Sequence, residues 1–143
     1  MTRIVFEDVS KVYGDRPRQV QEAMALLRQN VPSDEIFART GCRVGLRHIS
    51  LEIPSGGIFC VIGLSGSGKS TLVRHINRLI EPTCGRIQAC DIDVTALDAR
   101  GLREFRRARV SMVFQHFGLL PHLTVMQNTC FGLRVRGLSA KEQ

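Results

Sequence analysis

One stretch of the chain has residue types and spacing that could bind phosphate: "GLSGSGKST", residues 63–71. The spacing Gly–x4–Gly–Lys–Ser is the P-loop pattern, in which backbone N–H groups and one lysine surround a nucleotide's phosphates. Glycines allow backbone angles and close approaches that a side chain would prevent. The predicted phosphate-binding residues are Gly63, Leu64, Ser65, Gly66, Ser67, Gly68, Lys69, Ser70 and Thr71.

Different groups of this stretch suit different parts of a nucleotide. The amides from about Gly66 to Thr71 can point into one concavity, and the helix that follows adds its positive N-terminal end. The Lys69 ammonium can reach the β- and γ-phosphates, and the Ser70 hydroxyl can bind Mg²⁺. The stretch therefore predicts a site for the phosphates of a nucleotide with Mg²⁺, rather than a structural turn that is merely rich in glycine.

The flanking segments fit this reading. Residues 58–63, "IFCVIG", form a short continuous apolar run, which predicts a strand buried on both faces. Residues 69–80 carry apolar side chains at helical spacing and predict a helix directly after the loop. A strand, a glycine loop and a helix in this order favour an α/β domain of the P-loop NTPase type.

Before the loop, a helical insert at about residues 14–41 separates two strands. Ser33 is the expected N-cap of its second helix, and Gly41 is the expected stop. Periodicity places two strands at 3–9 and 43–53 and two helices at 18–30 and 34–40.

After the loop, the pattern alternates again. It predicts a pair of short strands, or a strand and a turn, in 86–94, and a basic helix at 97–109. An apolar strand is predicted at 110–115 and a helix at 123–137, capped by Thr124. "SAKE" at 139–142 is a capping box, which announces another helix just before Gln143. We therefore expect the N-terminal part of a longer protein, or a shortened relative, with an incomplete sheet.

Composition sets outer limits on the function. The 143 residues are 43% hydrophobic and 23% charged with a formal charge of +7, which suits an anionic partner such as a nucleotide. Five cysteines without a CxxC pair argue against a disulfide framework and a zinc site, and we expect buried thiols. No signal core and no run of about 18 apolar residues is visible, so no membrane-spanning segment is predicted.

Longer motifs resemble the ATP-binding-cassette (ABC) transporter ATPases. Residues 63–87 are similar to the P-loop region of that family, and residues 110–133 to its Q-loop region. "GLSGSGKST", "NRLIEPT" and the insert ending in "TGCRVGLRHISLEI" resemble the glycine betaine/proline betaine/choline uptake subgroup. The resemblance covers essentially the whole chain.

The resemblance implies two further ATP-binding residues. Tyr13 in "KVYG" matches an aromatic residue that stacks on adenine, although a plain core or turn residue is the alternative. Gln115 in "VFQHF" matches the Q-loop glutamine, which binds Mg²⁺ and orients water; the alternative is a polar residue at a strand end. Residues 120–143 match the start of the helical subdomain that meets the permease.

The same resemblance implies the cellular setting. ATP and Mg²⁺ are the expected cofactors, and Lys69 and Gln115 the expected contributors to hydrolysis. The implied partners are a membrane permease, a second ATP-binding subunit and, indirectly, a periplasmic or lipid-anchored substrate-binding protein, with no nucleic acid. The implied location is peripheral, on the cytoplasmic side of the inner or plasma membrane.

Several family motifs are missing from these 143 residues. No LSGGQ-type signature, no Walker B run ending in Asp–Glu and no switch histidine is found. We therefore expect negligible ATP hydrolysis by this chain alone, and whether it is an enzyme stays open. A catalytically inactive nucleotide-binding module and a misfolded remnant are the alternatives to a transport ATPase subunit.

Some residues depart from the family or invite other interpretations. Cys90–Asp91 stands where the family often has Asp–Gly, so a strained hairpin is expected, and Gly57 stands where Glu is common. The arginine-rich helix at 97–109 suits a solvated face, with protein contact or nucleic acid as alternatives. The histidines lack metal-ligand spacing and are expected to be structural or exposed: His48, His75, His116 and His122.

Overall fold

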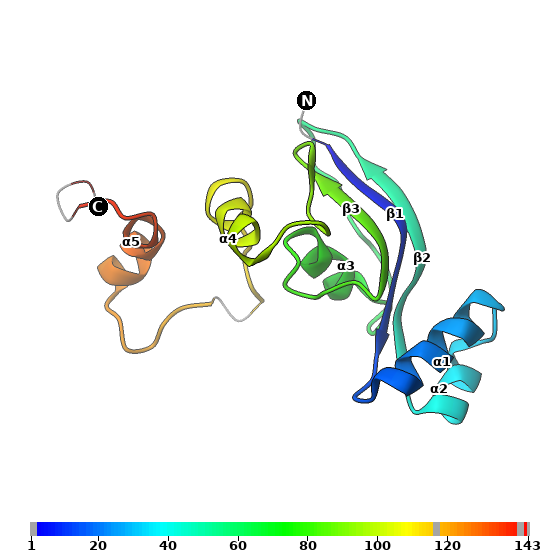
Figure 1. The fold of residues 1–143 in the computed structure, drawn as a ribbon. Helices are drawn as coiled ribbons and strands as arrows, with labels where there is room; N and C mark the ends of the chain where they lie inside the picture. The colour runs from blue at the N-terminus through cyan, green and yellow to red at the C-terminus, as the bar shows by residue number, and fades with distance from the viewer. Residues whose placement is uncertain (1–2, 116–117, 140–141, 143) are drawn as a thin grey trace. The chain divides into compact units, whose positions relative to one another are not determined.

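The computed structural model describes residues 3–115, 118–139 and 142, in two compact units, Met1–Leu102 and Arg103–Gln143. In the first unit four strands form one antiparallel sheet in the order β2-β1-β3-β4 (Figure 1). The strands are β1 (Ile4–Tyr13), β2 (Arg43–Ile53), β3 (Cys84–Ala89) and β4 (Ile92–Asp93). The predicted strands at 3–9, 43–53 and within 86–94 are confirmed.

The predicted helical insert lies between β1 and β2 in the sequence, and it stands at the end of the sheet where β1 ends and β2 begins (Figure 1). Its helices are α1 (Pro17–Arg28) and α2 (Ser33–Thr40). They enclose a small core with the end of β1, made of Val12, Ala23, Met24, Leu27, Ile36 and Cys42. The insert is therefore an integral part of the unit.

The ends of α2 follow the prediction at one terminus only. Gly41 ends the helix with φ 71°, in the left-handed region that favours glycine. The prediction that Ser33 is the N-cap is wrong, because Ser33 is already helical and the extended Pro32 holds the cap position without a side-chain hydrogen bond.

A second core joins the sheet to α3 (Lys69–Ile76), the helix after the phosphate loop. Leu72 and Ile76 of α3 pack against sheet residues that include Phe6 and Ile87. The helix ends four residues earlier than the predicted Ile80. Arg78 adopts φ 52° and Asn77 Oδ1 accepts a hydrogen bond from Leu79 N–H at 3.2 Å, which stops helical continuation.

The hairpin between β3 and β4 has a left-handed backbone conformation at two residues that are not glycine. Cys90 and Asp91 both have positive φ, 55° and 61°. Two-residue hairpins of type I′ need positive φ at both central positions, where Gly and Asn are preferred. The expectation of an unfavourable turn at Asp91 is confirmed.

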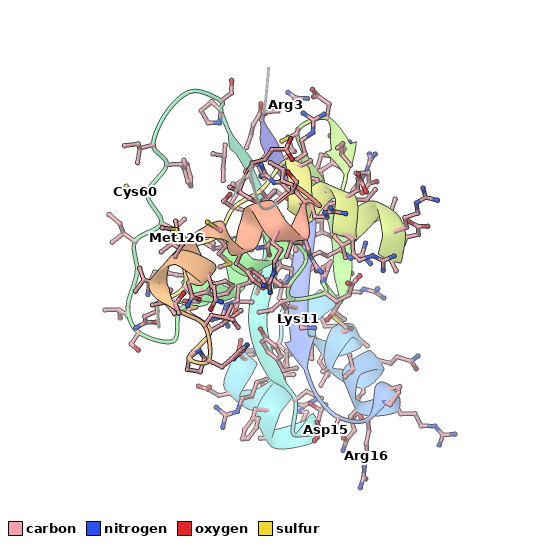
Figure 2. The ribbon with its side chains drawn as sticks, turned by 90° about the vertical axis from the view of Figure 1, so that its left-hand side faces the viewer. Arg3, Lys11, Asp15, Arg16, Cys60 and Met126 are labelled. Atoms are coloured by element: carbon pink, nitrogen blue, oxygen red, sulfur yellow. The ribbon has the colours of Figure 1, made fainter. Side chains whose placement is uncertain are left out.

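Two predicted strands are wrong: residues 58–63 and 110–115 form no regular structure. The side chains of Ile58, Ile62 and Val113 are 96%, 92% and 94% exposed. Figure 2 shows Cys60 on a loop that runs away from the strands of its unit. The apolar runs are present, but a strand also needs a neighbouring strand to hydrogen-bond to, and the four-stranded sheet of the described residues includes neither segment.

Cysteine burial also differs from expectation. Cys42 is buried, Cys60 is exposed, and the other three cysteines are intermediate. The exposure of Cys60 follows from the unpaired state of residues 58–63.

Among the described residues after β4, two segments are helical. The predicted basic helix is confirmed as α4 (Ala99–Ala108), whose Phe105 is buried, and the predicted helix near 123–137 as α5 (Val125–Val135). Thr124 caps α5 as expected, because Gln127 N–H donates to Thr124 Oγ1 at 3.2 Å and Thr124 N–H donates to Gln127 Oε1 at 2.9 Å. None of the helices in the described ranges is long and apolar enough to cross a membrane.

The predicted capping box at 139–142 falls partly outside the described residues. Its two defining side chains are described, and Glu142 Oε2 accepts hydrogen bonds from Ser139 N–H at 2.9 Å and from Ser139 Oγ at 2.7 Å. The helix that it would start lies on residues 140–141 and 143, outside the described ones.

Candidate nucleotide site

The phosphate loop has a backbone that only glycine tolerates at two positions. Gly66 and Gly68 have φ 79° and 90°. A Cβ on Gly68 would also lie 2.6 Å from the carbonyl oxygen of Gly45 on β2. The loop therefore rests directly on the β2 backbone, as the glycine pattern predicts.

The loop leads straight into the first turn of α3. Gly68 holds the N-cap position, and its carbonyl accepts from Leu72 N–H at 2.8 Å. The N–H groups at the start of an α-helix have no acceptor within the helix. Those of Lys69, Ser70 and Thr71 are thus available to an anion, in the field of the positive helix end.

The Lys69 ammonium is folded back over the loop. Lys69 Nζ donates to the carbonyl oxygens of Gly63 and Leu64 at 2.8 and 2.6 Å, and Ser67 Oγ lies at 3.5 Å. These contacts hold the positive charge beside the loop amides. A bound phosphate, carrying full negative charge, would compete with the two neutral carbonyl groups for this ammonium.

A cavity of about 530 Å³ adjoins the loop. Its lining combines the phosphate loop with β1, α2 and the start of β2. The lining residues are Tyr13, Ser33, Asp34, Phe37, Arg43, Val44, Gly45, Gly66, Ser67, Gly68, Lys69, Ser70 and Thr71.

Six of the predicted loop residues, Gly66 to Thr71, line this cavity. The other three do not line it. Among them, Gly63 and Leu64 act through their carbonyl oxygens, which position Lys69. Ser65 makes no contact with the cavity, and its role in binding stays a prediction.

Tyr13 is joined to the phosphate loop. Its hydroxyl lies 3.2 Å from Thr71 Oγ1, and its ring packs so closely on Gly45 that a Cβ there would lie 2.5 Å from the ring. The Lys11 ammonium stands 5.1 Å from the ring centroid. Tyr13 is 40% exposed and lines the cavity, so it is placed beside the predicted phosphate site despite the intervening insert.

Sequence reasoning missed the part of the cavity that comes from the insert. Ser33, Asp34 and Phe37 of α2 line it, and so does Arg43 at the start of β2. A signal existed, because positions 33 and 37 share one helix face and Arg43 is the cross-strand partner of Tyr13.

The donor set fits Mg²⁺ held mainly by a nucleotide. Within the described residues no group of three His, Cys, Asp or Glu side chains could hold a metal. Mg²⁺ usually keeps several waters and binds proteins through one or two oxygen ligands plus substrate phosphates. Ser70, which lines the cavity, carries a hydroxyl oxygen that could supply one such ligand.

Gln115 belongs to the second unit, whereas the cavity lies in the first, whose histidines do not line it. Gln115 is exposed at a turn of the second unit, and its role at the metal stays a prediction. His116 lies outside the described residues.

His75 is a buried structural histidine of α3. Its Nδ1 lies 2.6 Å from the Thr71 carbonyl oxygen, whereas Nε2 has no hydrogen-bond partner among the described residues. The ring is fully buried, and this burial lowers its pKa, assisted by the nearby Lys11 and opposed by Glu81. The lowered pKa favours the neutral form of His75, and the Nδ1 contact joins its ring to the backbone of the preceding helical turn.

A phosphate loop at the start of a helix, packed on an antiparallel sheet, defines this domain as a nucleotide-binding α/β domain. The chain belongs to the ABC transporter family, whose model matches residues 46–143. The fold is similar to that of the ATP-binding cassette MJ0796 in a dimeric post-hydrolysis state bound to ADP and Pi. The TM-score is 0.74 at 27% identity, over 97% of this chain and 51% of that chain. The predicted fold class, the N-terminal portion of an ABC ATPase, is confirmed.

Two relatives indicate which subgroup of the ABC transporter family this chain resembles. The chain is 41% identical over 141 residues to the glycine betaine/proline betaine transport ATP-binding protein ProV of Escherichia coli, covering 99% of this chain and 34% of the relative. It is 44% identical over 141 residues to the glycine betaine transport ATP-binding protein OpuAA of Bacillus subtilis, covering 99% and 33%. The chain thus spans about a third of the length of these curated relatives.

Proposed function

We propose that this chain binds Mg·ATP in the cavity beside the phosphate loop. We also propose that it forms the N-terminal part of the ATP-binding subunit of an importer for osmoprotectants of the glycine betaine, proline betaine or choline type. The observation that carries the binding proposal is that the first turn of α3, with Lys69, Ser70 and Thr71, lines one cavity together with the preceding loop residues Gly66 to Gly68. The importer proposal is supported by the similarity to two betaine transport ATP-binding proteins, at 41% and 44% identity.

Each chemical group has one proposed role. The loop amides and Lys69 hold the phosphates, Ser70 binds the Mg²⁺ that neutralises phosphate charge, and Tyr13 contacts the base. Gln115 is proposed to sense the metal from the Q-loop. The partners proposed for the whole subunit are a membrane permease and a second ATP-binding subunit, at the cytoplasmic face of the membrane.

Isothermal titration of the full chain with Mg·ATP tests the binding proposal. The expected result is saturable binding that weakens at least about tenfold in Lys69→Ala, because a charge-assisted contact to phosphate is lost. Arg74→Ala removes one positive charge from the same helix at a position outside the cavity lining, and should bind as the unmodified chain does.

Two results would contradict the proposal. One is a folded chain without affinity for ATP at millimolar magnesium. The other is equal affinity in the unmodified chain and in the double variant Lys69→Ala/Ser70→Ala.

A further inference from the structure

The wall of the cavity opposite the phosphate loop belongs to the helical insert. Ser33, Asp34 and Phe37 lie on one face of α2 and line the cavity together with Arg43, the first residue of β2. This wall offers an aromatic ring, a guanidinium, a carboxylate and a hydroxyl. None of these groups has a phosphate-binding role in the loop.

Phe37 faces the cavity instead of the core of the insert. The buried positions of α2 are Ile36 and Thr40, whereas the Phe37 side chain is 45% exposed. The Arg43 guanidinium carbon lies 5.0 Å from the centroid of the Phe37 ring. The two planar groups therefore form one cation–π pair at the cavity surface.

This pair is continuous with the phosphate site. Arg43 is the cross-strand partner of Tyr13 in the β1–β2 pairing. The Tyr13 hydroxyl in turn lies 3.2 Å from Thr71 Oγ1, at the end of the phosphate loop. A row of planar side chains thus leads from the phosphate site through Tyr13 and Arg43 to Phe37.

The chemistry of this row suits the base and sugar of a nucleotide. Aromatic rings and guanidinium planes stack on nucleobases. The Asp34 carboxylate can accept hydrogen bonds from an exocyclic amine or from ribose hydroxyls. Lys11, on the other hand, stands near the Tyr13 ring and competes for one of its surfaces.

We propose that Phe37 and Arg43 of the helical insert contact the base of the nucleotide whose phosphates occupy the 63–71 loop, so that the insert forms part of the nucleotide site. This inference rests on the proposed function, since it concerns the same bound ATP. The insert would then contact the base of a purine nucleotide, which the phosphate loop does not reach through phosphate contacts alone.

The proposal is tested by comparing the affinities of the full chain for two probes. Mg·ATP has a base, and inorganic tripolyphosphate has none. Phe37→Ala should weaken ATP binding about fivefold or more, the typical loss when an aromatic stacking partner is removed, and leave tripolyphosphate binding unchanged. Phe37→Tyr keeps the ring and should keep the affinity for ATP. Arg39→Ala, on α2 but outside the cavity lining, is the matched control.

A measurement on the unmodified chain removes any dependence on variant folding. Nuclear Overhauser contacts are expected between the adenine H2 or H8 protons of bound ATP and the Phe37 ring protons. The inference is overturned if these contacts are absent from a saturated complex, or if Phe37→Ala weakens both probes equally or neither. If the unmodified chain binds neither probe, the proposed function fails as well, whereas Lys69→Ala weakening both probes upholds the phosphate site alone.

Discussion

Two apolar segments of the first unit differ in structure: one is a paired strand and the other forms no regular structure. β1 (Ile4–Tyr13) is paired on both sides, with β2 and β3, and its Phe6 is 2% exposed. Residues 58–62, "IFCVI", are at least as apolar, yet they form no strand, and Ile62 is 92% exposed. The difference teaches that apolar and β-branched composition supports a strand only where a neighbour satisfies its backbone N–H and C=O groups.

The largest expected effect compares the two segments directly. Phe6→Ala should lower the free energy of unfolding by about 3–5 kcal/mol, because it opens a cavity in the core between the sheet and α3. Ile62→Ala removes an exposed side chain and should change it by less than about 0.5 kcal/mol. Urea unfolding followed by circular dichroism measures both, and equal losses would show that residues 58–62 are packed after all.

A second prediction concerns α3, which packs on the paired strands. Burial lowers the pKa of His75 below its ordinary value of 6.5, so below that pH the unfolded chain binds a proton that the folded chain does not. The free energy of unfolding should therefore fall as the pH drops below about 6.5, by up to about 1.4 kcal/mol per pH unit from this group.

His75→Gln isolates that contribution, because all other titrating groups are common to both chains. Unfolding at pH 7.5 and pH 5.5 should show a smaller loss in the variant than in the unmodified chain. An identical pH dependence in the two chains would mean that the His75 ring is accessible to water, and thus that α3 is not closely packed on the sheet.

The smallest expected effect lies at the β3–β4 turn, where the pairing of β3 with β4 keeps Asp91 in an unfavourable left-handed conformation. Asp91→Gly should raise the free energy of unfolding by about 1 kcal/mol, because glycine adopts the observed φ of 61° without steric cost. Thermal unfolding measures it. A stability below that of the unmodified chain would mean that the Asp91 side chain itself stabilises the turn.

These contrasts explain what the sequence could predict. Local signals succeeded where local physics decides, as in the left-handed stop at Gly41, the cap at Thr124 and the glycine-dependent loop of Gly66 and Gly68. Predictions failed for the strands at 58–63 and 110–115, because strand formation depends on neighbours that a single segment does not specify.

The candidate site likewise has one part that the sequence predicts and one part that it does not. The phosphate loop was predictable because its spacing is local and its chemistry is carried by consecutive residues. The insert wall of Phe37 and Arg43 was not, since it depends on the register that sets Arg43 opposite Tyr13. Tertiary pairing thus decides both whether the two predicted strands form and which residues of the insert line the cavity.

Amide hydrogen exchange with and without Mg·ATP measures whether the backbone N–H groups of the phosphate loop bind the nucleotide. We expect ATP to slow exchange at the amides of residues 66–71 in the unmodified chain, and to slow it less in Lys69→Ala at the same ATP concentration. Unaltered exchange at these amides under saturating ATP, with protection elsewhere in the chain, would contradict it.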